Sequence, residues 1–230
     1  MDTASLRQRF TRLVHTHSSV FGGAILDSGL TCSRCGWCCC ENFKIKITED
    51  ISRPSNAISV FPDDIRRIMK GKGIEWDEIV QPDIYSCLND DKDIRAIGWI
   101  LRRNALGECI FYRSGDCTIY DCRPMICRCY PFFMENKGIG IEVMHCERQK
   151  DRIVKENDKK GEKENARQMA LLVKRYEMKK LRNYISIISQ LGEKLRYSDL
   201  CSLPHTYDGE LIVCDGDTIS RRSIKNNIMG

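Results

Sequence analysis

The chain has 230 residues, of which 30% are charged, and a formal net charge of +5. This length can bury one sizeable core and leaves room for an appendage. No apolar run approaches the about 18 residues needed to cross a bilayer, and charges occupy the N-terminal positions where a secretory signal would be apolar. We therefore expect a cytoplasmic protein that neither spans a membrane nor is secreted.

The N-terminal third is predicted to contain two helices with a strand between them. Residues 2–20 carry apolar side chains at helical spacing. Residues 43–48 alternate apolar and basic side chains, which is typical of a half-exposed strand. Residues 61–69 carry Pro62 and two acids in the first turn, which favour a helix N-terminus. We expect Gly71 and Gly73 to end this second helix.

The middle of the chain is predicted to consist mainly of strands. Residues 96–102 and 108–112 have strand-like composition, and the four residues 104–107 between them suit a hairpin turn. Pro124 fits the first turn of a short helix, which would carry Cys127. Residues 138–145 predict a further strand.

The C-terminal third carries the basic excess. Residues 147–182 contain thirteen Lys and Arg against seven Asp and Glu. Apolar side chains predict a long amphipathic helix over residues 163–192, with Gly161 separating it from an earlier charged helix, and residues 208–216 predict a terminal strand or hairpin. Because acids are interleaved and the aromatic residues lie mostly on the apolar helix face, we expect no nucleic-acid partner.

These elements together predict an α+β fold, a small cysteine-rich domain of short strands and helices with a helical C-terminal extension. The expected organisation is an N-terminal helical segment over residues 1–30 and a cysteine-cluster domain over residues 31–150. Residues 151–230 would add the amphipathic helix and terminal hairpin, packed on that domain. The sequence leaves the oligomeric state open.

Cysteine is the most informative residue type. The chain has fourteen, five of them within residues 32–40 as two Cys-x2-Cys steps ending in a triplet, and six more within residues 109–146. Packing does not require sulfur at such density, whereas soft metals do. Cytoplasmic thiols are kept reduced, which favours metal or redox chemistry over disulfides. We predict that the two segments meet around a thiolate-ligated centre.

The spacing leaves the metal open. Zinc usually takes two separated Cys-x2-4-Cys pairs, whereas a Cys-x2-Cys-x2-Cys run is closer to the ligation of a [4Fe–4S] cluster in bacterial ferredoxins. The Cys-Pro continuation of the ferredoxin motif is missing. Either centre would carry negative charge, which neighbouring cations would have to balance. Five basic residues next to the cysteines in sequence could do so, namely Arg34, Lys44, Lys46, Arg123 and Arg128.

The two cysteine segments resemble a known family. Cys-x2-Cys-Gly-x-Cys-Cys over residues 32–39, followed by Tyr-x2-Arg-Pro-x2-Cys-Arg over residues 120–128, is similar to the YkgJ-like cysteine-cluster family of zinc- or iron-chelating domains, which includes flagellin lysine N-methylase. The resemblance covers about residues 30–150. It implies that the metal ligands are Cys32, Cys35, Cys38, Cys39, Cys109, Cys117 and Cys127, with Cys146 as an eighth. Because these exceed four, there are two centres or one centre with spare thiols nearby.

The remaining sulfur and nitrogen donors fall into two groups. Three extra cysteines, namely Cys40, Cys122 and Cys129, depart from the family pattern and leave open which thiol of each neighbouring pair is the ligand. Three isolated ones, Cys87, Cys201 and Cys214, are expected to be small core residues. His145 is read as a hydrogen-bonded histidine at a strand end, with metal ligation as the alternative.

Two functional classes follow. One is a binding module whose iron–sulfur cluster or zinc organises the fold or carries electrons. The other, implied by the resemblance to flagellin lysine N-methylase, is S-adenosylmethionine-dependent methyl transfer to a protein lysine, in which Arg123 and Arg128 would bind a carboxylate of the cofactor. A thiol–disulfide redox protein is a third reading. The catalytic residues stay unassigned, since no nucleophile–base pair or glycine-rich cofactor loop is recognisable.

Overall fold

The computed structural model describes most of the chain. The described residues are 3–30, 36–40, 44–46, 52–85, 87–90, 93–135, 138–144, 159–191, 200–201, 203, 207–216 and 218–224. Helices and short strands in small sheets give an α+β fold, as predicted. None of the described helices combines the length and the apolar character needed to cross a membrane.

The chain divides into two compact units. The first comprises Met1–Cys35 and Met125–Ile185, and the second comprises Gly36–Pro124 and Ser186–Gly230. Each unit is built from segments that are remote in sequence. The division into functional domains at residues 30 and 150 stays a prediction.

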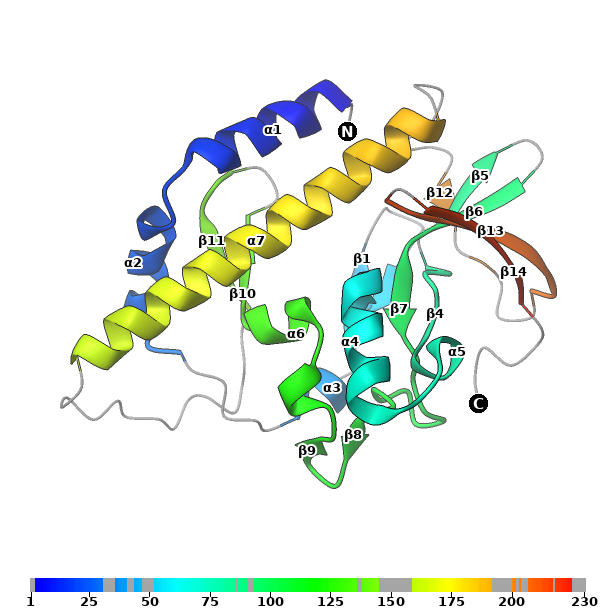
Figure 1. Ribbon diagram of the computed structural model, residues 1–230, viewed down its shortest axis with the longest axis horizontal. Helices are drawn as coiled ribbons and strands as arrows, with labels where there is room; N and C mark the ends of the chain where they lie inside the picture. Colours follow the sequence, from blue (N-terminus) through cyan, green and yellow to red (C-terminus); the bar gives the residue numbers. More distant parts are fainter. Residues whose placement is uncertain are drawn as a thin grey trace. The chain divides into compact units, whose positions relative to one another are not determined.

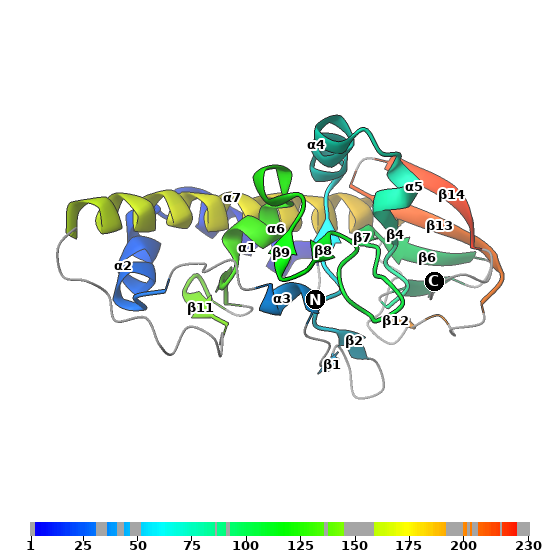
Figure 2. The same cartoon turned by 90° about the horizontal axis from the view of Figure 1, so that it is seen from below.

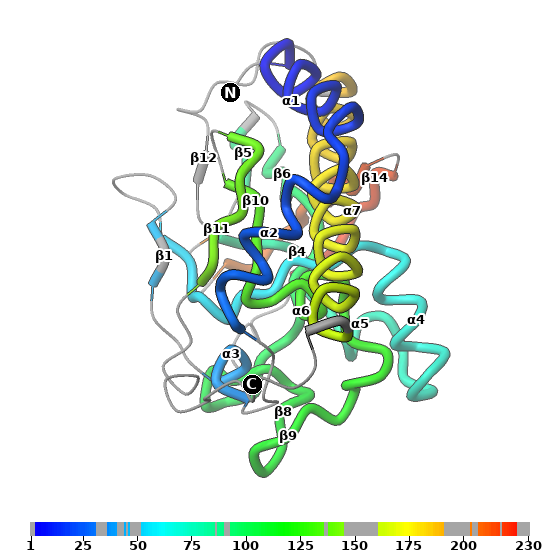
Figure 3. The backbone as a smooth tube through the Cα atoms, turned by 90° about the vertical axis from the view of Figure 1, so that its left-hand side faces the viewer, coloured from blue at the N-terminus to red at the C-terminus, as the bar shows by residue number. Residues whose placement is uncertain are grey.

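The first unit is mainly helical. Its elements are α1 (Thr3–His15), α2 (Ser19–Asp27), α6 (Met125–Cys129), the antiparallel pair β10 (Phe132–Met134) and β11 (Ile141–Val143), and α7 (Lys159–Leu191) up to residue 185. Helix α1 lies alongside α7 (Figures 1 and 3). The two helices are joined by an ion pair of 2.9 Å between Arg9 and Glu177, whose carboxylate is buried. The β10–β11 pair confirms the strand predicted near residues 138–145.

Two helix predictions need correction. The helix expected over residues 2–20 is broken after His15, and a second helix begins at Ser19, whose backbone N–H donates to the ring of His17 at 3.3 Å. Gly161 does not separate two helices: α7 begins at Lys159 and continues through it. Gly161 is the third residue of this 33-residue helix, outside the interior where a glycine costs about 1 kcal/mol.

The second unit contains the largest sheet, of five strands. Their order is β12 (Leu200–Cys201), β5 (Cys87–Asp90), β6 (Asp93–Ile97), β13 (Gly209–Asp215) and β14 (Thr218–Ile224). Strands β13 and β14 form an antiparallel hairpin, which confirms the predicted terminal strand or hairpin, and β13 is parallel to β6. The last residues of α7 belong to this unit, where Ile187 packs against Ile212 and Cys214.

Smaller sheets complete the second unit. Strands β3 (Ser59–Val60), β7 (Trp99–Leu101) and β4 (Val80–Pro82) form one sheet, and β1 (Lys44–Lys46) pairs with β2 (Ser52–Pro54). Strand β1 confirms the strand predicted at residues 43–48. The single strand expected over residues 96–102 is instead divided at Gly98, whose φ of +83° sends β6 and β7 into different sheets.

Of the strand expected over residues 108–112, Cys109 forms a bridge with Arg103, and Tyr112 begins a separate two-residue strand. The preceding turn is tight, as predicted: Gly107 donates its backbone N–H to the carbonyl of Asn104. The Asn104 side chain accepts the N–H groups of Leu106 and Glu108, and the backbone N–H groups of Asn104 and Ile110 donate to the carbonyls of Glu108 and Arg102 across the turn. After this turn, the side chain of Cys109 is buried in the core of the unit.

Helix α4 (Pro62–Lys72) confirms the predicted second helix, and Gly73 ends it with a φ of +66°. Gly71 lies inside its last turn and does not end it. The other elements of this unit are short. They are α3 (Trp37–Cys40), α5 (Trp76–Ile79), the paired strands β8 (Tyr112–Arg113) and β9 (Asp116–Cys117), and the 3₁₀ helix η1 (Tyr120–Cys122). Helix α3 lies beside the β8–β9 hairpin (Figures 1 and 2).

Candidate metal centre

Helix α3 holds the cysteine triplet in a single turn. The backbone N–H groups of Cys39 and Cys40 both donate to the carbonyl of Gly36, at 2.8 and 3.2 Å. Gly36 has a φ of +71°, and a β-carbon there would come within 2.0 Å of the Tyr112 ring. Only glycine fits both requirements. The glycine of the cysteine motif therefore turns the chain and seats an aromatic ring against it.

Tyr112 in turn places Cys117. Strands β8 and β9 pair antiparallel with Tyr112 opposite Cys117, so both side chains leave the hairpin on the same face. The two-residue loop, Ser114 and Gly115, has positive φ at both positions, which is the twist that tight hairpins need. The ring that packs on Gly36 thus brings the Cys117 thiol toward α3.

Cys109 is tied directly to α3. Its backbone N–H donates a hydrogen bond of 2.9 Å to the carbonyl of Cys39, and its side chain is buried in the core of the unit. Residues seventy positions apart are therefore joined by their backbones.

Four thiols consequently lie close enough to influence one another. A hydrogen bond with Cys109 raises the pKa of the Cys39 thiol well above its ordinary value, and burial and the charges of Cys109 and Cys117 add to this, while a hydrogen bond with Cys38 opposes it. Burial raises the pKa of Cys117, which also feels the charge of Cys38. Cys38, Cys39, Cys109 and Cys117 therefore form one group, here called the thiol cluster.

Within the described part of the chain, no three Cys, His, Asp or Glu side chains are arranged to hold an ion. Hydrogen bonds between protonated thiols join Cys39 to Cys109 and to Cys38, whereas Cys117 interacts with Cys38 and Cys39 through charge. A metal would have to replace those protons and draw the sulfurs onto a common centre. Four soft donors from two remote segments are nevertheless a set that zinc or iron accepts.

The other predicted site residues are not placed in this cluster. Cys32, Cys35 and Cys146, with His145 and Arg34, lie outside the described residues. Cys127 and Arg128 lie on α6, in the first unit, where Cys127 is half-buried and Arg128 is exposed. The ligand roles of these cysteines stay predictions. Lys44 and Lys46 are exposed on β1.

Among the described residues, Arg123 is a basic residue whose charge acts on the thiol cluster. Its charge lowers the pKa of Cys117, in opposition to the larger effect of burial. The guanidinium carbon lies 3.7 Å above the ring of Tyr120, and the buried Nε atom has no hydrogen-bond acceptor among the described residues. A cation held by an aromatic ring beside thiols is suited to balance negative charge there.

The extra cysteines have separate surroundings. Cys40 donates to the carbonyl of Trp37, Cys122 packs against α4, and Cys129 is fully buried on α6. Two of the isolated cysteines, Cys87 and Cys214, are buried core residues as predicted. The side chain of Cys201 lies outside the description.

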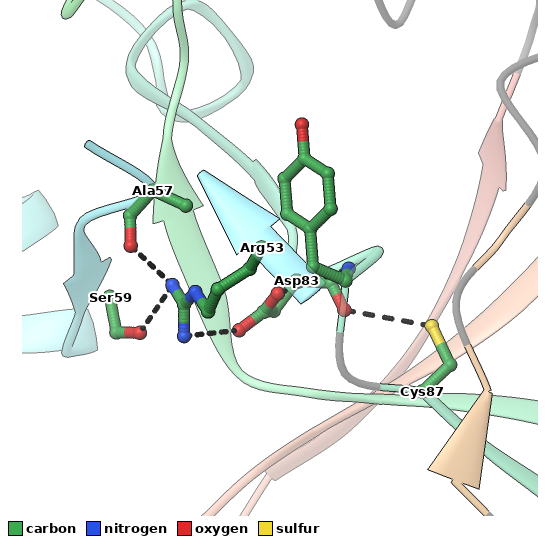
Figure 4. A network of polar contacts seen from close by, with 6 residues as sticks. Arg53, Ala57, Ser59, Asp83 and Cys87 are labelled. Atoms are coloured by element: carbon green, nitrogen blue, oxygen red, sulfur yellow. Dashed lines mark hydrogen bonds and ion pairs between the residues drawn. The ribbon is translucent and has the colours of Figure 1, made fainter. Parts of the chain in front are cut away.

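A second polar network in the same unit was not anticipated (Figure 4). Arg53 contacts the buried carboxylate of Asp83 at 3.5 Å and donates to the carbonyl of Ala57 and the hydroxyl of Ser59. Cys87 donates its thiol proton to the carbonyl of Asp83. Burial raises the pKa of Asp83, and the charge of Arg53 opposes that shift. This network links β2, β3 and β5 and supports the fold around the site.

The comparison with protein families agrees with the cysteine pattern. The family model "CxxCxxCC: Putative zinc- or iron-chelating domain" matches residues 31–160, more than half of the chain. The chain belongs to this CxxCxxCC family. As a member it is a metal-binding cysteine-cluster protein, and the matched region includes every predicted cysteine ligand. Neither the curated proteins nor the solved structures gave a match.

Sequence reasoning missed the residues that build the site without carrying sulfur. Gly36 and Tyr112 were not singled out, although a glycine inside a Cys-rich turn is a signal for positive φ. Arg67 and Asp64 on α4 were also missed. Their spacing of three residues indicates an ion pair on a helix, but not what that pair contacts.

Proposed function

We propose that this CxxCxxCC protein carries a thiolate-ligated metal centre at the thiol cluster, an iron–sulfur cluster of the [4Fe–4S] type in preference to zinc. The single observation that carries the proposal is the meeting of Cys38 and Cys39 with Cys109 and Cys117. The close Cys-x2-Cys-x2-Cys run supports iron over zinc. Cys32, Cys35, Cys127 and Cys146 stay proposed ligands on the strength of the family pattern.

Arg123 supports an anionic centre. Four thiolates on Zn²⁺ or on an oxidised [4Fe–4S] core carry a net charge of about −2, which is costly to bury without cations. Arg123 already lies beside Cys117 and has a buried donor to spare among the described residues. We propose that it balances part of this charge. We further propose a cytoplasmic location, where the thiols remain reduced.

Anaerobic purification followed by metal and acid-labile sulfide analysis tests the proposal. Iron and sulfide in equal amounts, with visible absorption that bleaches on reduction, would establish the cluster. Zinc without sulfide would establish the zinc alternative. Folded wild-type protein that takes up neither iron nor zinc after anaerobic reconstitution would refute metal binding at the cluster.

A second candidate is S-adenosylmethionine-dependent methyl transfer to a protein lysine, with a protein as substrate and partner. The observation that favours it is the buried Arg123 Nε without an acceptor among the described residues, because a carboxylate could accept from it. Calorimetry of the metal-loaded protein with S-adenosylmethionine tests this candidate. Binding that disappears in Arg123→Ala would support it, and the absence of binding to the wild type would remove it.

A further inference from the structure

One face of helix α4 packs on the segment that carries Arg123. Asp64, Arg67 and Gly71 follow one another at spacings of three and four residues, so they share a face of the helix. Arg67 pairs with Asp64 at 2.6 Å, and the Asp64 side chain is only 3% exposed. Asp64 also accepts the backbone N–H of Phe61 at 3.4 Å at the start of α4. The carboxylate is thereby fixed on both sides and holds the guanidinium in place.

Arg67 donates hydrogen bonds to two consecutive backbone carbonyls, those of Cys122 and Arg123. Its Nε donates to the carbonyl of Cys122 at 3.4 Å, and its Nη2 donates to the carbonyl of Arg123 at 2.9 Å. Cys122 is the last residue of η1 and Arg123 is its C-cap, so their carbonyls have no partner within the 3₁₀ turn and need donors from outside it. The fork of a guanidinium can meet both at once, which an ammonium group cannot do in the same way.

The third member of the face allows this close approach. A β-carbon on Gly71 would lie 3.1 Å from the Sγ atom of Cys122. Glycine therefore lets η1 settle directly on the last turn of α4. The contact and the two hydrogen bonds act on the same two residues, Cys122 and Arg123.

The direction of the Arg123 side chain depends on that backbone. Residue 123 is extended, with φ of −56° and ψ of 151°, and from there its guanidinium lies over the ring of Tyr120, three residues after Cys117. The interaction between two charges weakens as their separation grows, so a shift of this backbone would reduce the effect of Arg123 on the centre.

We propose that the Asp64–Arg67 ion pair is a positioning device that holds Arg123 beside the metal centre. The inference rests on the proposed metal binding at the thiol cluster. Arg67 acts through Arg123: its hydrogen bonds go to the backbone carbonyls of Cys122 and Arg123, whereas the Arg123 side chain lies over the ring of Tyr120, three residues from Cys117. Groups that orient the surroundings of a metal in this way typically change metal affinity about 10- to 100-fold when removed.

Titration of the metal-free, reduced protein with Co²⁺ tests the inference, because Co²⁺ bound to thiolates absorbs in the near ultraviolet and visible. We expect Arg123→Ala and Arg67→Ala each to weaken Co²⁺ binding about 10-fold or more. Arg66→Ala is the matched control, since Arg66 lies on the same helix and pairs with the exposed Asp63. We expect its Co²⁺ affinity to equal that of the wild type.

The double variant separates positioning from a merely structural role. If Arg67 acts through Arg123, then Arg67→Ala combined with Arg123→Ala binds Co²⁺ no more weakly than Arg123→Ala alone. Multiplicative losses, or wild-type affinity in Arg67→Ala, would overturn the inference. Wild-type protein that binds no Co²⁺ and also takes up no iron and sulfide on anaerobic reconstitution would instead refute the proposed function. Should Arg67→Ala fail to fold, Asp64→Asn gives the same readout, because it weakens the ion pair while keeping an acceptor for the N–H of Phe61.

Discussion

The backbone N–H of Cys109 donates a hydrogen bond of 2.9 Å to the carbonyl oxygen of Cys39. This bond joins the two cysteine segments independently of any metal, since it involves main-chain atoms alone. The thiols of the same two residues are also hydrogen-bonded. The fold therefore brings the remote sulfurs together without a metal. A bound metal would arrange the thiol side chains, and it would not be needed to join the two segments.

Replacing either of these cysteines is expected to abolish most metal binding. Cys39→Ser and Cys109→Ser each remove one thiolate from the thiol cluster, and a hydroxyl is a poor ligand for a soft metal. We expect metal content per chain to fall to a small fraction of the wild-type value after anaerobic reconstitution. Cys214→Ala is the control, because this core cysteine lies in the large sheet. Full metal content in Cys39→Ser would show that Cys39 is not a ligand.

Gly36→Ala is expected to destabilise the second unit. The substitution adds a side chain at positive φ and forces it into the Tyr112 ring, a combination of strain and overlap that typically costs about 2–4 kcal/mol. Gly115→Ala separates the two causes, because its φ is +89° but no atom lies within 4 Å of the added carbon. Urea denaturation should show a larger loss for Gly36→Ala, reduced when Tyr112→Ala is added. Equal losses at the two glycines would contradict the proposed contact.

The sequence was sufficient to predict the α+β class, helix α4, the terminal hairpin and the presence of a cysteine cluster. These features depend on local signals: Pro62 and two acids at a helix start, Gly73 at its end, and cysteine at a spacing that packing does not require. Periodicity within a short window carries such information.

Features set by tertiary contacts were not predictable in the same way. The break after His15 is accompanied by a hydrogen bond from the N–H of Ser19 to the ring of His17, and Gly161 lies in the first turn of α7. The division at Gly98 follows from two sheets that compete for one stretch of chain. At the site, Arg67 looks like any surface arginine until the carbonyls of residues 122 and 123 are placed against it.

The buried carboxyl of Asp83 predicts a pH dependence of stability. Burial raises its pKa in the folded protein above the about 4 of an unfolded chain, despite the opposing charge of Arg53. The folded state therefore holds this proton to higher pH. The contribution of the group to stability is present in full below about pH 4 and is lost as pH rises through the folded pKa.

Asp83→Asn tests this dependence, because the amide does not titrate. We expect the free energy of unfolding of the wild type, relative to Asp83→Asn, to decrease as the pH is raised from about 4 toward neutrality. Urea denaturation at several pH values measures the difference. A difference that stays constant or increases over this range would mean that Asp83 remains ionised in the fold, as the partner of Arg53.

In the first unit, Arg9→Ala is expected to be strongly destabilising. Arg9 contacts the buried carboxylate of Glu177 at 2.9 Å, and its removal leaves Lys180, at 3.4 Å, as the remaining basic partner among the described residues. Removing one partner of a buried ion pair typically costs about 3–5 kcal/mol, and the second partner should reduce this to about 2 kcal/mol. Arg7→Ala, an exposed position on α1, is the control. A thermal melt in which both variants behave alike would contradict the role of the pair.

Cys117 and Cys122 offer the clearest test of which thiol in a crowded segment binds metal. Cys117 lies in the thiol cluster, whereas the Sγ atom of Cys122 faces Gly71 on α4. We therefore expect Cys117→Ala to lose the metal and Cys122→Ala to keep it. Because Cys122→Ala also removes packing against α4, it should lower the free energy of unfolding by about 1 kcal/mol while leaving metal content unchanged. Metal analysis and urea denaturation of the same preparations separate the two effects. The opposite pattern, with metal lost from Cys122→Ala and retained by Cys117→Ala, would move the centre toward α4 and exclude Cys117 as a ligand.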